Sequence, residues 1–333
     1  MITRYVAFLI ASCCSFALAA DPVVVAKDGS GDFRTVQAAV DASPSNGAVI
    51  RIRPGTYEEK VVVDKAKIQL LGLGADPREV VLSFNLSSGT AGGTYKSAST
   101  TVTGDDFVAE NLTFENTFSR SHGLTEQGSQ AVALRVTGDR AIFRRVRFLG
   151  YQDTLYATTS GCMSGVDGCK TARQYFKDCY IEGNIDFIFG DALAYFENCE
   201  IHSLAHDTVA ITAQSKVRPD EKSGYVFNHC RLTAEPGAKK VYLGRPWRSY
   251  ASVVFLNTYM GPEIMPSGWL EWVQGGRPSL PTVFYAEYHS QGPGANPAER
   301  DPHSVQLTAE QARKYEMRTF LAGDDGWDPE RVK

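Results

Sequence analysis

Two aspartates are the residues of this chain whose setting best suits chemistry. Asp153 lies within Tyr151-Gln-Asp-Thr-Leu155 and Asp186 opens Asp186-Phe-Ile-Phe-Gly190, so each carboxyl has apolar or amide neighbours. Burying a carboxylate in such surroundings costs free energy unless the group is paired or has a task. For one aspartate alone, a turn residue or a satisfied ion pair is the simpler interpretation. The matching position of both in an internal repeat favours a joint role.

The repeat is a frame of six residues. The first is aromatic or apolar, the second and third are polar, the fourth is a cysteine or apolar, the fifth is polar and the sixth is apolar. Its copies start at Ala109, Phe143, Phe176, Phe196, Phe227 and Phe255, at intervals of 34, 33, 20, 31 and 28 residues. Short alternating strands repeated in this way indicate a solenoid. The uneven intervals favour an all-β, single-stranded parallel β-helix with loops of different length over helical repeats, which keep a stiffer period.

The two aspartates occupy the same place in successive copies of the repeat. Asp153 lies ten residues after Phe143, and Asp186 lies ten residues after Phe176. If the insertion in the first coil falls after Asp153, within residues 160–170, the two carboxyls lie side by side on strands about 4.8 Å apart. Two such carboxylates cannot both ionise cheaply, so we expect one raised pKa and one low pKa. That division suits a general acid and a nucleophile.

Two glutamines near the aspartates offer amide donors. Gln130 opens the apolar run Gln130-Ala-Val-Ala-Leu134, and Gln152 directly precedes Asp153. Each is interpreted either as a satisfied polar residue at a strand edge or as a donor to an oxyanion that forms beside the carboxyl pair. A serine hydrolase has no support, because the chain lacks a Gly-x-Ser-x-Gly nucleophile elbow.

Arg245 and Trp247 lie at the end of another candidate strand, within Leu243-Gly-Arg-Pro-Trp247. Arg245 can hold a carboxylate in its ionised form, and Trp247 can stack on the face of a sugar. The alternative is a surface arginine stacked on a tryptophan. We expect Trp269, together with Trp272, to extend an aromatic-lined cleft.

The N-terminus predicts export. Residues 1–20 contain Arg4, an apolar run and the small-residue stretch Ala17-Leu-Ala-Ala20, as in a secretory signal peptide, which leaves residues 21–333 as one domain. The alternatives are a buried N-terminal strand and a bacterial lipoprotein in which Ile10-Ala-Ser-Cys13 is cleaved and Cys13 carries lipid. We therefore expect a secreted protein, extracellular or periplasmic.

Composition excludes several other classes. The 333 residues are 43% hydrophobic and 22% charged with a net charge of −4, which gives no reason to expect nucleic-acid binding. Beyond the N-terminus no apolar run is long enough to span a membrane. No CxxC motif or His/Cys spacing suggests a metal site.

The cysteines that remain after export can form disulfides. Cys179 and Cys199 hold the same frame position on successive coils, so we expect a disulfide between them, with two unbonded core thiols as the alternative. Cys162 and Cys169 are close in sequence and can close a loop. Cys230 is then the odd one out, a buried thiol in the same column.

Two helices are expected at the ends of the solenoid. Thr35 to Ala42 predicts a short helix that caps the open end of the core. Thr308-Ala-Glu-Gln311 predicts a capping box for a helix that runs to about Leu321, with Gly323 as its stop. We expect this second helix to pack across the solenoid, and the capped protein to be a monomer.

Five short motifs together resemble the signatures of the pectin methylesterases. In chain order they are Gly55-Thr-Tyr57-x-Glu59, Gln130-Ala-Val-Ala-Leu134, Tyr151-Gln-Asp-Thr-Leu155, Asp186-Phe-Ile-Phe-Gly190 and Leu243-Gly-Arg-Pro-Trp247. The resemblance extends from about residue 23 to 329. It implies a right-handed parallel β-helix that hydrolyses the methyl esters of polygalacturonate, with methyl-esterified homogalacturonan (pectin) as its partner and no metal or organic cofactor.

The resemblance also implies a role for each matching residue. Asp186 is similar to the family's nucleophile, Asp153 to its acid/base, Gln130 and Gln152 to its oxyanion donors, Arg245 and Trp247 to its substrate-cleft residues, and Thr94 to a substrate-binding threonine. Two departures stand out. The gap between the aspartates is about a dozen residues longer than is usual in the family, and the subsite residues of some bacterial members, near Ala210 and Ser249, are not recognisable.

Rival functions remain open at this stage. One is a pectin-backbone hydrolase or lyase on the same solenoid, although the chain lacks the Gly-His-Gly element associated with polygalacturonases. Another is a non-catalytic polysaccharide-binding solenoid, which the presence of both aspartates and Arg245 disfavours. A third is a family-like esterase that acts on another carbohydrate ester, which the lipoprotein alternative at Cys13 would suit.

Overall fold

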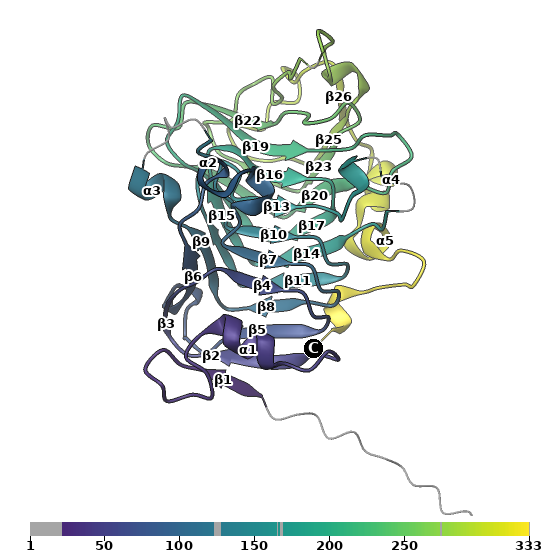
Figure 1. Ribbon diagram of the computed structural model, residues 1–333. Coiled ribbons are helices and arrows are strands. Elements are labelled where there is room, and N and C mark those ends of the chain that lie inside the picture. The colour runs from purple at the N-terminus through teal and green to yellow at the C-terminus, as the bar shows by residue number, and fades with distance from the viewer. Residues whose placement is uncertain (1–21, 123–127, 165, 167–168, 274, 333) are drawn as a thin grey trace, which may run out of the picture.

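A computed structural model describes residues 22–122, 128–164, 166, 169–273 and 275–332, and in it the chain winds into a parallel β-helix (Figure 1). From β2 to β22 each coil contributes one strand to each of three parallel sheets, always in the same order, and the two ends of the chain add further strands. The predicted fold class is therefore confirmed. The signal peptide and the lipoprotein box at Cys13 fall outside the described residues.

Within the described residues the sheets have eleven, eight and seven strands. Sheet 1 consists of β1 (Val23–Val25), β2 (Ala48–Ile52), β5 (Ile68–Gly72), β8 (Val108–Glu110), β11 (Ala141–Arg144), β14 (Arg173–Lys177), β17 (Leu193–Glu197), β20 (Gly224–Asn228), β23 (Ser252–Leu256), β25 (Phe284–Tyr288) and β26 (Ser304–Gln306). Sheet 2 consists of β3 (Gly55–Glu58), β6 (Val80–Phe84), β9 (Thr113–Asn116), β12 (Arg147–Leu149), β15 (Tyr180–Gly183), β18 (Glu200–Ser203), β21 (Arg231–Ala234) and β24 (Tyr259–Met260). Sheet 3 consists of β4 (Val61–Val63), β7 (Thr100–Val102), β10 (Leu134–Val136), β13 (Leu155–Ala157), β16 (Ile185–Gly190), β19 (Thr208–Gln214) and β22 (Lys240–Gly244).

A column of phenylalanines explains the sequence repeat. The first residue of each frame pairs with the first residue of the next in sheet 1, from Phe143 through Phe176, Phe196 and Phe227 to Phe255. Their rings stack with centroids 4.7, 4.6, 4.4 and 4.7 Å apart, and all five are fully buried. The repeat therefore records one layer of the core per coil.

The second polar residue of each frame turns the chain from sheet 1 into sheet 2. These residues, which we call the corner ladder together with His289 in the equivalent place after β25, have φ between 48° and 57°: Asn111, Arg145, Asp178, Asn198, His229, Asn257 and His289. The left-handed conformation is uncommon outside glycine and is best tolerated by Asn, Asp and His. Exposed Asp178 accepts a hydrogen bond from Asn198 Nδ2 on the next coil, so the corner side chains also interact along the stack.

The N-terminal cap forms as predicted. Helix α1 (Val36–Ala42) begins after Thr35, whose side chain accepts a hydrogen bond from Ala38 N. Its apolar residues Val36 and Val40 are buried in the main core cluster. Figure 1 shows α1 at the end of the stack, beside β1 and β2.

The C-terminal helix is broken where one continuous helix was predicted. The capping box at Thr308 is present, but α4 (Ala309–Ala312) and η5 (Arg313–Tyr315) are separated from α5 (Met317–Leu321) by extended backbone at Glu316. Tyr315 stacks on Phe284 and Phe320 lies against Tyr195, both in sheet 1. Side chains five residues apart on one α-helix would point about 140° apart, so the break lets both rings face the sheet.

The remaining short helices lie in connections between strands, except η6, which lies near the C-terminus after the last strand. They are α2 (Ser88–Ala91), α3 (Phe118–His122), η1 (Pro77–Glu79), η2 (Thr94–Lys96), η3 (Cys162–Ser164), η4 (Leu280–Thr282) and η6 (Pro329–Arg331). No helix among the described residues is long and apolar enough to cross a membrane.

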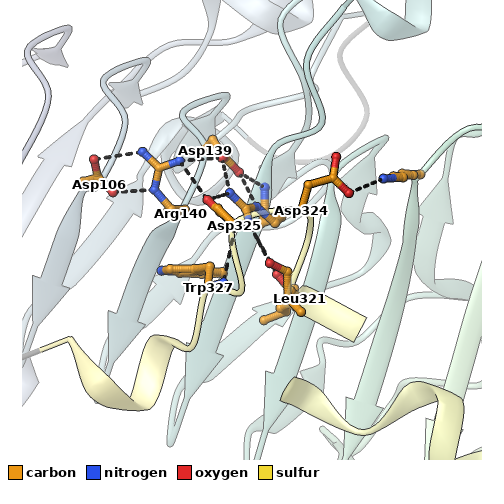
Figure 2. A network of polar contacts seen from close by, with 10 residues as sticks. Asp106, Asp139, Arg140, Leu321, Asp324, Asp325 and Trp327 are labelled. Atoms are coloured by element: carbon orange, nitrogen blue, oxygen red, sulfur yellow. Dashed lines mark hydrogen bonds and ion pairs between the residues drawn. The ribbon is translucent and has the colours of Figure 1, made fainter. Parts of the chain in front are cut away.

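Ion pairs fasten the C-terminal segment to sheet 1 (Figure 2). The buried Arg173 guanidinium lies 2.6 Å from Asp139 Oδ2 and 2.9 Å from Asp325 Oδ2. It also lies over the Trp327 ring in a cation–π contact. Arg140 pairs with Asp106 on the neighbouring coil at 2.6 Å. In Figure 1 the segment, in yellow, runs from β26 back along sheet 1. It therefore packs across the solenoid, as predicted.

The cysteines follow only part of the prediction. Cys162 and Cys169 form a disulfide with Cα atoms 5.2 Å apart, which confirms the loop closure. The disulfide between Cys179 and Cys199 is wrong, because both are free and buried, as is Cys230. Equivalent positions on parallel strands send side chains in the same direction, about one strand spacing apart, whereas a disulfide needs sulfurs that converge to about 2 Å.

Candidate active site

A cavity of about 510 Å³ lies on the outer face of sheet 3. It brings together eight of the residues predicted from the sequence: Thr94, Gln130, Gln152, Asp153, Asp186, Arg245, Trp247 and Trp272. Along β13 the buried side chains alternate, with Leu155 and Ala157 in the core and Tyr156 in the cavity wall. The strands of sheet 3 thus hold the core with one face and the cavity with the other.

The two aspartates lie in equivalent positions on neighbouring coils, with Asp186 in β16 and Asp153 just before β13. Leu155 pairs with Ile188, and each lies two residues after its aspartate. The backbone N–H of Asp153 donates to Ile185 O at 3.1 Å. The loop from Thr158 to Lys170 follows β13, so the extra residues of the first coil do fall after Asp153. The equal offset from the phenylalanine column therefore predicted the pairing correctly.

Both aspartates have left-handed backbone, with φ of 65° at Asp153 and 52° at Asp186. The register between β16 and β19 also shifts at this point, since Ile185 pairs with Ala210 and Ile188 with Thr212. A β-bulge of this kind re-aims a side chain that would otherwise follow the alternation of the strand.

Arg245 binds the carboxylate of Asp186. Its Nε lies 2.7 Å from Asp186 Oδ1 and its Nη2 lies 2.6 Å from Oδ2, a bidentate geometry. Arg245 directly follows β22, and its backbone N–H donates to Thr212 O at 2.9 Å, which fixes the residue beside β19. The guanidinium also lies over Trp272, with its Cζ atom 4.3 Å from the ring centroid.

Asp153 and Asp186 have different surroundings, so their carboxyl groups differ in how readily they keep a proton. Burial, and then the charge of Asp186, raise the pKa of Asp153 well above its usual range. Burial also raises the pKa of Asp186, but the hydrogen bonds and the charge of Arg245 oppose that rise. The expectation of a low pKa for one carboxyl is therefore wrong in direction, because burial acts on both. The order holds: Asp153 retains a proton more readily, and Asp186 carries the charge beside Arg245.

The two glutamines are half-buried at the cavity wall. Their backbones are fixed, because Gln130 O accepts from Ser88 N and Gln152 O accepts from Ala131 N. Neither side-chain amide makes a hydrogen bond to another described residue. Both can therefore donate to a ligand.

An aromatic wall faces the polar groups. The rings of Tyr156 and Phe189 stack with centroids 4.2 Å apart, and Trp247 meets Phe189 edge-on at 5.8 Å. Sequence reasoning missed Tyr156 and Phe189, although each lies three residues after its aspartate and the equal-offset argument that paired the aspartates would have paired these rings too.

Trp269 is not part of the site. It is 3% exposed and stacks on Tyr285 in the core at 3.9 Å, whereas Trp272 lines the cavity. Gly244 pairs with Trp269 in an isolated bridge, which brings this residue next to the end of β22 with its side chain inward. The two tryptophans are three residues apart, so they face opposite sides of extended chain.

Known proteins resemble the chain along almost its whole length. The family model described as Pectinesterase matches residues 22–324. Pectinesterase 31 of Arabidopsis thaliana is 39% identical over 324 residues, which cover 93% of each chain. Probable pectinesterase/pectinesterase inhibitor 17 of the same plant is 38% identical over 324 residues, or 94% of this chain, but the chain spans only 59% of that relative's length.

Solved structures agree with the sequence matches. Pectin methylesterase from carrot superposes with a TM-score of 0.81 at 32% identity, covering 93% of this chain and 96% of the carrot chain. A pectin methylesterase in complex with a hexasaccharide has a TM-score of 0.76 at 32% identity, covering 92% of this chain and 98% of that one. The chain thus belongs to the pectinesterase family of carboxylic ester hydrolases.

Proposed function

We propose that this protein hydrolyses the C6 methyl esters of polygalacturonate, releasing methanol and leaving free carboxylates. The observation that carries the proposal is the buried pair in the cavity, with Asp186 held by Arg245 and Asp153 inclined to keep its proton. A charged nucleophile beside a protonated carboxyl is the combination that an ester needs. The family membership supports the same reaction class.

In the first step Asp186 attacks the ester carbon. A bond forms between a carboxylate oxygen of Asp186 and C6, and the carbonyl oxygen takes the negative charge. Gln130 and Gln152 donate hydrogen bonds to that oxygen. The bond to the methoxy oxygen then breaks, Asp153 gives its proton to the departing oxygen, and methanol leaves. The product of this step is an anhydride between Asp186 and the galacturonate.

In the second step water releases the enzyme. Asp153, now a carboxylate, takes one proton from a water molecule while the water oxygen attacks the anhydride at C6. The bond to Asp186 breaks, the free galacturonic acid leaves, and Asp153 is protonated again. Arg245 holds Asp186 charged and oriented before attack and receives the regenerated carboxylate.

The remaining cavity residues are assigned to substrate binding. Trp247 offers an aromatic face on which a sugar ring can stack, and Thr94 offers a hydroxyl at the cavity edge. Methyl-esterified homogalacturonan fits this mixture of apolar wall and few polar groups.

The reaction is tested by following three products from methylated polygalacturonate at once. The proposal expects methanol and free carboxylates in equal amounts, with no new reducing ends and no unsaturated ends. New reducing ends would indicate a backbone hydrolase, and unsaturated ends a lyase. Acetate release from an acetylated polysaccharide at a comparable rate would indicate an esterase for another ester. Binding without any product would indicate a non-catalytic solenoid.

We also propose that the cell exports this chain after removal of residues 1–20 and that residues 21–333 act as a monomeric domain. The sequence pattern of the N-terminus supports export. The mass of the mature N-terminus tests it, since a lipid-bearing Cys13 would give a different and heavier terminal peptide. Sedimentation of the mature protein tests the monomer.

A further inference from the structure

Met163 contributes to the cavity wall from a loop and not from a strand of the β-helix. Met163 lies in η3, within the loop that connects β13 to β14, and it lines the same cavity as the two aspartates. It is half-buried and packs against the apolar cluster that contains Tyr156 and Phe189. Its thioether therefore forms part of the surface that a substrate meets.

Two attachments hold the backbone of Met163 in place. The first is the disulfide between its neighbour Cys162 and Cys169, which closes a short loop. The second is a chain of hydrogen bonds: Cys162 N donates to Thr159 Oγ1 at 3.1 Å, and Thr159 Oγ1 donates to Asp191 Oδ2 at 2.7 Å.

Asp191 links this loop to the catalytic strand. It is 2% exposed and directly follows β16, the strand that carries Asp186. Its Oδ1 also accepts from Thr159 N and from Thr158 Oγ1, both at 2.6 Å. Because strand and loop share this buried carboxylate, Met163 is fixed relative to the nucleophile.

We propose that Met163 is a specificity residue, held over the cleft by the Cys162–Cys169 disulfide, that favours methyl-esterified over free galacturonate. This inference rests on the proposed function. A thioether is apolar and adaptable, and it offers no charge or strong donor to a carboxylate. The Met163 thioether gains contact with an ester methyl group. A charged carboxylate beside the thioether loses hydration and gains no hydrogen bond or opposite charge in return. Substrate is therefore held more tightly than the demethylated product.

The test compares variants of the whole mature protein on methylated polygalacturonate. Met163→Ala should raise KM roughly three- to tenfold with little change in kcat, because the lost apolar contact serves the bound substrate and the transition state alike. Met163→Leu, which keeps the apolar volume, should restore KM. Val166→Ala is the matched control, since Val166 belongs to the same loop and is 52% exposed; its KM should equal that of the original protein.

The disulfide is tested separately. The double variant Cys162→Ser with Cys169→Ser should raise KM as Met163→Ala does, while combining both changes should add little further. Inhibition by fully demethylated polygalacturonate should stay the same in every variant, because the thioether favours the ester alone. Thermal unfolding confirms that each variant is folded.

The outcomes separate the inference from the reaction itself. An unchanged KM in Met163→Ala, or an equal weakening of substrate and demethylated product, overturns the role of Met163 while methanol release by the original protein still supports the esterase. If the original protein releases no methanol, calorimetry with methylated and demethylated oligogalacturonates decides. Equal affinity for the two in the original protein also overturns the inference.

Discussion

The corner ladder and the cavity aspartates Asp153 and Asp186 have the same backbone conformation in opposite settings. Asp178, in the corner ladder, has φ 53° and an exposed side chain, while Asp186 has φ 52° and is 6% exposed. At the corner the conformation turns the chain, and the residue type varies among Asn, Asp, Arg and His. On sheet 3 it aims a carboxylate into a cavity beside Arg245. Burial and the ion pair with Arg245, and not the conformation, distinguish Asp186, the proposed nucleophile, from the structural Asp178.

Replacing one aspartate in each setting gives the sharpest contrast. Asp186→Asn should lower methanol release by roughly 10⁴-fold or more, because an amide cannot act as the nucleophile. Asp178→Asn should keep full activity, since that side chain lies at an exposed corner. Both variants should bind methylated oligogalacturonate, as measured by calorimetry. Similar losses in the two variants would contradict the role of Asp186 as nucleophile, because Asn keeps the left-handed conformation at both positions.

Arg245→Lys should have the next largest effect on activity. Lysine keeps the charge but loses the bidentate grip on Asp186, so we expect a fall in kcat of roughly 10²-fold. Arg245 opposes the rise in the pKa of Asp186, so its loss should raise that pKa further. Asp186 would then be ionised only at higher pH, and the acidic limb of the pH–rate profile should move upward. An acidic limb at the original pH would contradict the assigned ion pair.

Phe227→Ala tests the regular side of the molecule. The ring is fully buried between Phe196 and Phe255 in the stacked column. Its removal leaves a cavity, so the free energy of unfolding should fall by about 3–5 kcal/mol. KM and kcat of the folded variant should stay the same, because the column lies under sheet 1. Denaturant unfolding and methanol release measure the two effects, and a large change in kcat would show that the column also shapes the cavity.

Asp153→Asn should have the smallest effect on stability, and its sign depends on pH. Because the folded pKa of Asp153 is raised, this group stabilises the fold most below its unfolded pKa of about 3.9. That stabilisation is lost as pH rises through the folded pKa. The amide does not titrate, so the melting temperature of the variant relative to the original protein should rise with pH. A constant difference across the pH range would mean that Asp153 is not buried as a carboxylic acid.

The features that the sequence predicted well are those that repeat by one coil. The phenylalanine column and the pairing of Asp153 with Asp186 both follow from equal offsets in successive frames, because a parallel β-helix converts a fixed offset into a fixed position. The same offset failed for the Cys179–Cys199 disulfide. Equal positions make side chains parallel, which suits stacking rings but not converging sulfurs.

The features that the sequence did not predict depend on contacts outside the repeat. Trp269 lies beyond the last clear frame, so nothing in the local pattern indicated which of two nearby tryptophans faces the cavity. The break at Glu316 reflects where Tyr315 and Phe320 meet sheet 1, and the capping signal at Thr308 says only where the first helix begins. Tertiary contacts decided both.

The central claim, that Asp153 holds a proton beside an ionised Asp186, can be observed directly by infrared difference spectroscopy. The spectra are recorded at about pH 5.5, which is above the usual aspartate pKa of about 3.9. The spectrum of the original protein minus that of Asp153→Asn should then contain the carbonyl stretch of a protonated carboxylic acid. A carboxylate band in the Asp153 difference spectrum would contradict the account, because the proposed acid would then have no proton to give.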